Sequence, residues 1–410
     1  MAKEISRKGF EVLARKSGLY PQEELLAVEK RNNSLQIGVP KEISLQERRV
    51  PLTPGAVALL TNNGHEILVE SGAGKSANFN DNEYSDAGAK IVYSAKEAFE
   101  AQLVVKIEPP TKKEIEYLKP GKFIISALQI GQLDKAYFEA LNDKKINAIG
   151  VELVEDKVGG MPIVRAMSEI AGISAIHIAT ELLNNLNKGK GIILGGITGV
   201  RPTKVVILGA GTVGEYAARA ALGLGATIEI YDNQLYKLRR IKHALGQPVH
   251  TSTLDTVMLS ESLMEADVVI GAIRAEKGRN RCIITEEMVM NMQKDAVIID
   301  VTIDQGGCVE TSEVTTHDDP TFRKFDVIHY CVPNIASRVS RTASTAVSNI
   351  LTPMLLQAGE VGGIEEMIFT HSWFMKGVYT YKGGLTNMHI AKKFNLKYKE
   401  LSLLMAARFQ

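Results

Sequence analysis

Three glycines form the clearest binding motif in the chain. Gly209, Gly211 and Gly214 follow the apolar run VVIL in the order G-x-G-x-x-G, and a helix-forming segment comes after them. The first glycine allows a tight turn, the second lets the backbone approach a pyrophosphate, and the third lets the helix pack on the strand. Asp232 lies eighteen residues beyond Gly214, where its carboxylate can accept hydrogen bonds from a ribose. Together, strand, turn, helix and acid predict an NAD(H) site, with a glycine-rich packing turn as the alternative.

Neighbouring residues are expected to contact the same cofactor. Thr212 and Val213 lie within the glycine motif, at the expected N-terminus of the helix that faces the phosphates. Asp232 would accept from a ribose 2′-hydroxyl and repel a 2′-phosphate, which predicts a preference for NAD(H) over NADP(H). Lys237 is near enough in sequence to soften that repulsion and make the preference incomplete.

Length and composition set limits on the class of protein. With 410 residues the chain is long enough for two or more domains, and 45% hydrophobic and 23% charged residues are typical of soluble globular proteins. A net charge of +1 gives no case for nucleic-acid or membrane partners. Cys282, Cys308 and Cys331 lack metal-like spacing, and no signal core or stretch of eighteen uninterrupted apolar residues is present. We expect a cytoplasmic protein without a metal.

From Leu35 onward, strand-like and helix-like segments alternate. Thr53 and Pro54 provide a capping hydroxyl and a first-turn proline for one helix. Long helices are expected from Ser168 to about Asn185 and within 337–358, where Pro353 should kink or divide the second. The alternation predicts an α/β fold of mainly parallel sheets covered by helices.

Several further segments together resemble one protein family. They are IGVPKE with RVPLTP, HEILVESGAG, AMSEIAG, GGITGV, IDVTIDQGGCVE and YCVPN. From about Leu35 to Leu396 the chain resembles the alanine dehydrogenase and nicotinamide nucleotide transhydrogenase alpha-subunit family, and IDQGGC favours the dehydrogenases. The resemblance implies an NAD-dependent enzyme that converts L-alanine and water into pyruvate and ammonia. It also implies a homo-oligomer, usually a hexamer.

The resemblance also implies a domain plan. Two Rossmann-like doubly wound domains are joined by long helices, with a cleft between them. Residues 1–34 are an N-terminal extension, 35–165 form the substrate domain, 166–340 form the NAD(H)-binding domain, and 341–410 return to complete the first domain.

Five residues match family positions at that cleft. Arg49 matches the arginine that holds the substrate carboxylate, a role that suits a bidentate guanidinium, although a solvated surface charge is the alternative. Asp304 matches the aspartate beside nicotinamide and substrate, at what we expect to be the end of a strand; a turn-forming aspartate is the alternative. Asn334 matches an asparagine at the cleft, and Met167 and Ser168 match residues on the connecting helix. These three have capping or packing as alternatives.

Two positions depart from the family pattern. Aligned without gaps, the substrate-contacting lysine of the family falls on Glu108, and its catalytic histidine falls on Gln129. Glutamate reverses the charge, and glutamine cannot exchange a proton near neutral pH. Lys106 lies on the same face of an extended strand as Glu108 and is a candidate to compensate. Besides an alanine dehydrogenase, the sequence therefore allows a dehydrogenase for a different amino or imino acid, or a weakly catalytic NAD(H)-sensing protein.

Overall fold

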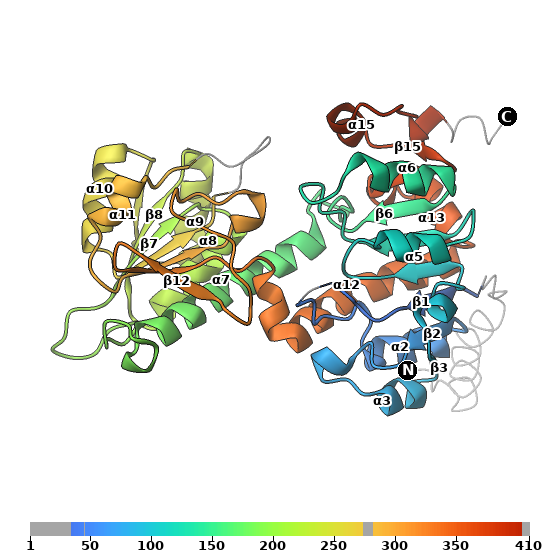
Figure 1. Cartoon of the computed structure of the whole chain (residues 1–410), viewed down its shortest axis with the longest axis horizontal. Coiled ribbons are helices and arrows are strands. Elements are labelled where there is room, and N and C mark those ends of the chain that lie inside the picture. Colours follow the sequence, from blue (N-terminus) through green and yellow to red (C-terminus); the bar gives the residue numbers. More distant parts are fainter. Residues whose placement is uncertain (1–33, 45, 274–281, 404–410) are drawn as a thin grey trace, which may run out of the picture.

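A computed structural model describes residues 34–44, 46–273 and 282–403, and these form two α/β bodies connected by two long helices (Figure 1). Almost all of the expected N-terminal extension, residues 1–34, lies outside the described residues. Each body is a mainly parallel sheet with helices on its faces, which confirms the predicted fold class.

The first sheet has eight strands in the order β15-β14-β6-β5-β4-β1-β2-β3. Strands β1 to β6 are parallel, whereas β14 pairs antiparallel with both β6 and β15. The end of the chain therefore returns to complete the sheet built by its beginning. The strands are β1 Gln36–Val39, β2 Glu66–Glu70, β3 Lys90–Val92, β4 Leu103–Val105, β5 Phe123–Ser126, β6 Asn147–Gly150, β14 Val378–Tyr381 and β15 Gly384–Leu385.

The second sheet has seven strands in the order β12-β13-β11-β10-β7-β8-β9, and only its edge strand β12 is antiparallel. In both sheets the strand order reverses beside the first strand, between β1 and β4 and between β7 and β10. Ligands of open α/β sheets bind at the carboxyl ends of strands at such a reversal. The strands are β7 Lys204–Leu208, β8 Thr227–Tyr231, β9 His250–Ser252, β10 Val268–Gly271, β11 Val297–Asp300, β12 Thr321–Lys324 and β13 Val327–Tyr330.

Shorter helices connect these strands, and side-chain caps define several helix starts. The Thr53 hydroxyl accepts from the Ala56 backbone N–H at 3.4 Å, as expected, and Asn80 and Thr111 form capping boxes with Glu83 and Glu114. The helices are α2 Pro54–Asn62, α3 Asp81–Asp86, α4 Ala95–Ala98, α5 Lys112–Tyr117, α6 Lys135–Asp143, α8 Thr212–Gly223, α9 Leu235–Leu245, α10 Thr256–Glu265, α11 Glu286–Met290, α13 Ile364–Thr370, α14 Ser372–Met375 and α15 Met388–Phe394. The 3₁₀ turns are η1 Lys75–Ala77, η2 Asn185–Asn187, η3 Ile303–Gln305 and η4 Ile335–Val339.

Two long helices, α7 Pro162–Leu183 and α12 Ser340–Glu360, run between the bodies (Figure 1). Helix α7 begins six residues before the predicted Ser168, because Pro162 suits the first helical position. Helix α12 is not divided at Pro353. A proline removes one backbone donor, but the buried side chains of Leu351 and Leu355 hold the flanking turns in the core.

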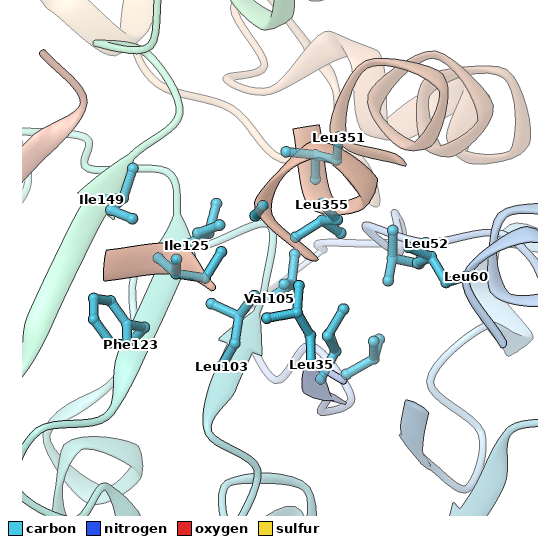
Figure 2. Close-up of a cluster of buried hydrophobic side chains, with 14 of the residues drawn as sticks. Leu35, Leu52, Leu60, Leu103, Val105, Phe123, Ile125, Ile149, Leu351 and Leu355 are labelled. Atoms are coloured by element: carbon cyan, nitrogen blue, oxygen red, sulfur yellow. The ribbon is translucent and has the colours of Figure 1, made fainter. Parts of the chain in front are cut away.

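Helix α12 closes the core of the first body. Its Leu351 and Leu355 lie over side chains from β4 and β5, including Val105 and Ile125 (Figure 2). Burying each such side chain contributes about 1.5–3 kcal/mol. The core thus fixes the carboxyl ends of β4 and β5, from which two candidate site residues emerge.

Helix α7 is also the one helix, among the described residues, with the length and mean hydropathy of a membrane span, over 162–182. It packs closely on α8, where a side chain at Gly172 would come within 2.4 Å of the Val213 carbonyl oxygen. A core helix of a globular protein has the same composition, because its neighbours cover its apolar surface.

Candidate active site

Each glycine of the G-x-G-x-x-G motif has a distinct geometric role. Gly209 has a φ of 109°, and a Cβ there would lie 2.5 Å from the Ala272 carbonyl oxygen at the end of β10. A Cβ on Gly214 would lie 1.8 Å from the Gly209 carbonyl oxygen, so this glycine lets α8 approach the turn. Around Gly211 no described atom lies within 4 Å of an added Cβ. The second glycine therefore leaves open space at the N-terminus of α8, as a pyrophosphate requires.

Asp232 lies directly after β8 and beside this turn. Its carboxylate is buried and accepts hydrogen bonds from the backbone N–H groups of Ala210 at 2.9 Å and Gln234 at 2.8 Å. Each carboxylate oxygen can accept more than one hydrogen bond, so these contacts orient the group and leave capacity for ribose hydroxyls. Lys237 is partly exposed on the first turn of α9, close in sequence to this acid.

Arg49 is the centre of the candidate substrate site, in the segment after β1. It is 8% exposed, and its Nε and Nη2 donate to Glu47 at 2.8 and 2.6 Å. Arg49 therefore belongs to a buried, fixed ion pair. It is not the solvated surface charge that the sequence left open as an alternative. Because the two carboxylate-facing nitrogens are held in one plane, the orientation of the guanidinium is set before any ligand arrives.

Glu108 and Gln129 meet beside this arginine. They follow β4 and β5, two neighbouring parallel strands whose carboxyl ends share one edge of the sheet. The Gln129 side-chain amide donates to Glu108 Oε1 at 2.9 Å, and the same oxygen lies 3.5 Å from Arg49 Nη2. Gln129 has a left-handed backbone with φ 43°, and its backbone N–H donates to Glu152 at 3.0 Å. The two departures from the family pattern therefore lie in direct contact.

The two carboxyl groups beside Arg49 have opposite protonation behaviour. Burial alone would raise the pKa of Glu47, but the hydrogen bonds and positive charge of Arg49 outweigh burial and lower it to about 2. Burial raises the pKa of Glu108 to about 8, and the adjacent negative charge of Glu47 adds to the rise. Near neutral pH one member is a carboxylate and the other is a carboxylic acid.

Lys106 has a different environment from the one expected of a substrate ligand. Its ammonium group is completely buried and binds Glu114 at 2.8 Å and Glu42 at 3.1 Å. Glu42 in turn accepts from the backbone N–H of Ile107 at 2.6 Å. Two carboxylates enclose this buried cation, so the structure favours a role for Lys106 in fixing the segment after β4.

Residues from the connecting helix and the second body reach the same arginine. Asn334, in a left-handed conformation with φ 60°, donates from its side-chain amide to Glu47 at 2.7 Å. On α7, the Met167 sulfur lies 3.3 Å from Arg49 Nη1, and partly buried Ser168 follows it. The structure thus brings Met167 to the guanidinium and Asn334 to its carboxylate partner, although the sequence predicted them from separate motifs.

Asp304 requires a correction to the predicted strand. Strand β11 ends at Asp300, and Asp304 is exposed on the following turn η3. The strand-end carboxylate is the fully buried Asp300, which accepts from Thr302, the Cys308 backbone N–H and the Ser312 hydroxyl at 2.8–3.1 Å. Asp300 thereby shapes the loop that carries Asp304. An acid inside an apolar strand was the signal in the sequence that could have identified it.

No group of three or more His, Cys, Asp or Glu in the described ranges is arranged to hold a metal ion. The chemistry that these residues offer is that of a carboxylate-binding cation, a carboxyl group that can exchange a proton, and a dinucleotide-binding turn.

Comparisons with known proteins show the family of this chain. The family models "Alanine dehydrogenase/PNT, N-terminal domain" and "Alanine dehydrogenase/PNT, C-terminal domain" match residues 38–171 and 175–388. An alanine dehydrogenase of Methanococcus maripaludis is 38% identical over 364 residues, covering 88% of this chain and 97% of that protein. Alanine dehydrogenase 2 of Staphylococcus aureus is 37% identical over 368 residues, covering 90% and 98%.

Solved structures are similar over the same length. An L-alanine dehydrogenase has a TM-score of 0.83 at 35% identity, covering 88% of this chain and 99% of that one. A transhydrogenase from Sinorhizobium meliloti has a TM-score of 0.74 at 21% identity, covering 86% and 99%, and supports the fold alone. With both domain models matched and relatives aligned over nearly their whole lengths, this chain belongs to the alanine dehydrogenase/PNT family.

Proposed function

We propose that this protein is an NAD-dependent alanine dehydrogenase, which converts L-alanine, NAD and water into pyruvate, ammonia and NADH. One observation carries the proposal: each sheet has a candidate binding feature at the point where its strand order reverses. Arg49 lies at this point in the first sheet, and the dinucleotide-binding glycine turn lies at this point in the second. Residues 35–165 with 341–410 would form the substrate domain, and 166–340 the NAD(H) domain.

The residues present fit this chemistry. When bound, NAD supplies the hydride acceptor; Gly211 and the first turn of α8 would hold its pyrophosphate, and Asp232 its adenosine ribose. Arg49 would bind the substrate carboxylate through its remaining N–H groups while Glu47 keeps the guanidinium oriented. Asp304 and Asn334 would lie beside nicotinamide and substrate, as the family resemblance implies.

Glu108 favours a second candidate, a dehydrogenase for a different amino or imino acid. It offers a carboxyl group 3.5 Å from Arg49, where the family resemblance implies a lysine. A carboxyl group suits an ammonium group better than a carbonyl oxygen, so substrates with a second amine are the ones to compare with alanine. A weakly catalytic NAD(H)-sensing protein is the third reading of the same substitution.

One screen separates these candidates. The purified protein is given NAD with L-alanine, D-alanine and a panel of amino acids, and NADH with 2-oxo acids and ammonia. We expect NADH formation with L-alanine and NADH oxidation with pyruvate and ammonia. Greater activity on another amino acid supports the second candidate, and NADH binding without turnover on any substrate supports the third.

Two arginine variants connect the activity to the site. Arg49→Ala should raise the KM for the amino acid at least tenfold, because loss of a charge-assisted contact costs about 1.5–3 kcal/mol. Arg48→Ala is the matched control, since Arg48 is the adjacent, exposed arginine and should keep the wild-type KM. Equal effects of the two substitutions would remove Arg49 from the proposed role.

We also propose a cytoplasmic homo-oligomer, a hexamer by family resemblance. An exposed apolar segment supports self-association: Ile193, Ile197 and Val200 are each more than half exposed, and Leu186 is 93% exposed. Light scattering of the purified protein tests this, and a monomer at micromolar concentration would contradict it.

A further inference from the structure

The carboxyl groups of Glu47 and Glu108 share one cation. Arg49 Nη2 lies 2.6 Å from Glu47 and 3.5 Å from Glu108, and all three side chains are at most 11% exposed. Two acids around one guanidinium carry one more negative charge than the arginine can balance. In a buried site this excess negative charge favours a proton on one of the two acids.

Hydrogen bonding assigns that proton to Glu108. Glu47 accepts from the backbone N–H of Arg49 at 2.9 Å, from the Arg49 guanidinium, and from the Asn334 amide, all of which favour a carboxylate. Glu108 accepts one hydrogen bond from Gln129 and lies 3.5 Å from Arg49, so fewer and longer contacts support its ionised form. Glu47 therefore fixes Arg49, while Glu108 holds an exchangeable proton.

The spacing of Arg49 and Glu108 suits the two charged groups of an amino acid. An α-amino acid carries its carboxylate and its ammonium group on a single carbon atom. A cation and a carboxyl group side by side can bind both at once. The substrate would then replace the single Arg49–Glu108 contact with two complementary ones.

We propose that Glu108 is a catalytic residue that accepts a proton from the substrate's ammonium group, with Gln129 as its positioning residue. This inference rests on the proposed function and deepens it. Glu108 thus performs proton transfer in a site where the family resemblance implies a histidine at position 129.

The proton transfer makes the substrate oxidisable. Glu108 first releases its own proton to solvent, a loss that the positive charge of a bound ammonium group favours. An N–H bond of the ammonium group then breaks, its electron pair stays on nitrogen, and an O–H bond forms on the ionised Glu108. The nitrogen pair then forms the C=N bond of an imino acid while the hydrogen on Cα leaves with its own electron pair. NAD, which the glycine turn and Asp232 would hold, would supply the acceptor for that hydride, so that the amino acid is oxidised and the cofactor is reduced. The proton on Glu108 returns to solvent before the next turnover.

The other titratable groups that face Glu108 already bind neighbouring residues. Glu47 holds Arg49, and Glu42 binds Lys106 and the Ile107 backbone. Lys106 is enclosed between Glu42 and Glu114. Gln129 has no titratable proton near neutral pH. In the described surroundings of Arg49, Glu108 is accordingly the group with both the position and the proton affinity for exchange.

Glu108→Gln tests the proposal because it keeps the shape and removes the proton acceptor. Near pH 7.5 we expect kcat/KM for L-alanine to fall by about a hundred- to ten-thousand-fold, the usual contribution of a general base. The loss should shrink as the pH approaches 10, because the substrate amine then becomes neutral without help. Glu108→Asp should restore part of the activity. NADH binding should stay at the wild-type level in both variants.

Glu116→Gln is the matched control, since it removes an exposed carboxylate on α5, in the same part of the chain as Glu108. It should keep the wild-type pH profile, and melting temperatures establish that each variant is folded. A Glu108→Gln loss that is the same at every pH up to 10, or a loss below threefold, overturns the role of Glu108. If the wild-type protein itself does not oxidise L-alanine, the proposed function fails instead, so the two failures are distinguishable.

Discussion

The side-chain amide of Asn334 donates to the Glu47 carboxylate at 2.7 Å, across 287 positions of the chain. Asn334 is the N-cap of η4, after the last parallel strand of the second sheet, whereas Glu47 lies in the segment after β1 of the first. Since the same carboxylate holds Arg49, the orientation of the candidate substrate-binding arginine depends on a residue from the other sheet.

Asn334→Asp should therefore weaken substrate binding without a direct change at Arg49. Aspartate tolerates the left-handed backbone but replaces the amide donor with a second negative charge beside Glu47. We expect the KM for L-alanine to rise about tenfold or more, because a hydrogen bond to a charged group contributes about 1.5–3 kcal/mol. Asn387→Asp, at the N-cap of α15, is the matched control. An unchanged KM in Asn334→Asp would show that Glu47 orients Arg49 alone.

Cofactor choice should follow Asp232. The carboxylate beside the glycine turn favours a ribose hydroxyl and repels a 2′-phosphate, so NADH should bind at least tenfold more tightly than NADPH. Asp232→Asn removes the charge and keeps one of the two oxygens that accept from the Ala210 and Gln234 backbone, so it should narrow that difference. Fluorescence titration with NADH and NADPH measures this difference in affinity. Asp255→Asn, at the N-cap of α10, is the control. Equal or tighter NADPH binding by the wild-type protein is the contrary result.

Asp304→Asn should abolish most turnover and spare NADH binding. The substitution keeps the side-chain shape on the exposed turn η3 but removes its charge and its capacity to accept a proton. Stopped-flow measurement of the first turnover, together with an NADH titration, separates chemistry from binding. Asp319→Asn, an exposed acid on another loop, is the control. A wild-type rate in Asp304→Asn would remove Asp304 from catalysis.

Stability should also depend on pH through Glu108. Its pKa rises from an ordinary 4.5 to about 8 on folding, so its contribution favours the folded state below pH 4.5 and is lost as the pH rises through 8. Glu108→Gln should then raise the melting temperature at pH 8.5 and leave it unchanged near pH 4.5. Each 1 kcal/mol corresponds to roughly 2–4 °C in a domain of this size. Scanning calorimetry at both pH values measures the difference, and a destabilised variant at pH 8.5 would contradict the assignment.

Local sequence patterns predicted the fold well. The glycine motif, the capping residue Thr53 and the alternation of apolar segments identified units whose structure depends on neighbours in the sequence. Pro353 shows the limit of such rules, because tertiary packing of α12 keeps the helix continuous. The antiparallel partners β12 and β14 were also beyond local reasoning, since their pairing depends on distant strands.

The site was less predictable because its contacts join remote residues. The sequence identified Glu108 and Gln129 as two separate departures from the family pattern. It could not predict the hydrogen bond between them, because that bond depends on the register of β4 against β5. Lys106 was expected to lie on the same strand face as Glu108. Its ammonium group is instead enclosed by Glu42 and Glu114. Glu47 was missed altogether, although a carboxylate two residues before an arginine was the available signal.

The most direct measurement follows the hydrogen on the substrate Cα. The purified protein is incubated with NAD and L-alanine carrying deuterium at Cα, and the reduced cofactor is analysed by NMR and mass spectrometry. We predict NADH with deuterium at C4 of the nicotinamide, together with pyruvate and ammonia in equal amounts. Absence of deuterium transfer from L-alanine, in a folded protein that binds NADH, would contradict the assignment as an alanine dehydrogenase.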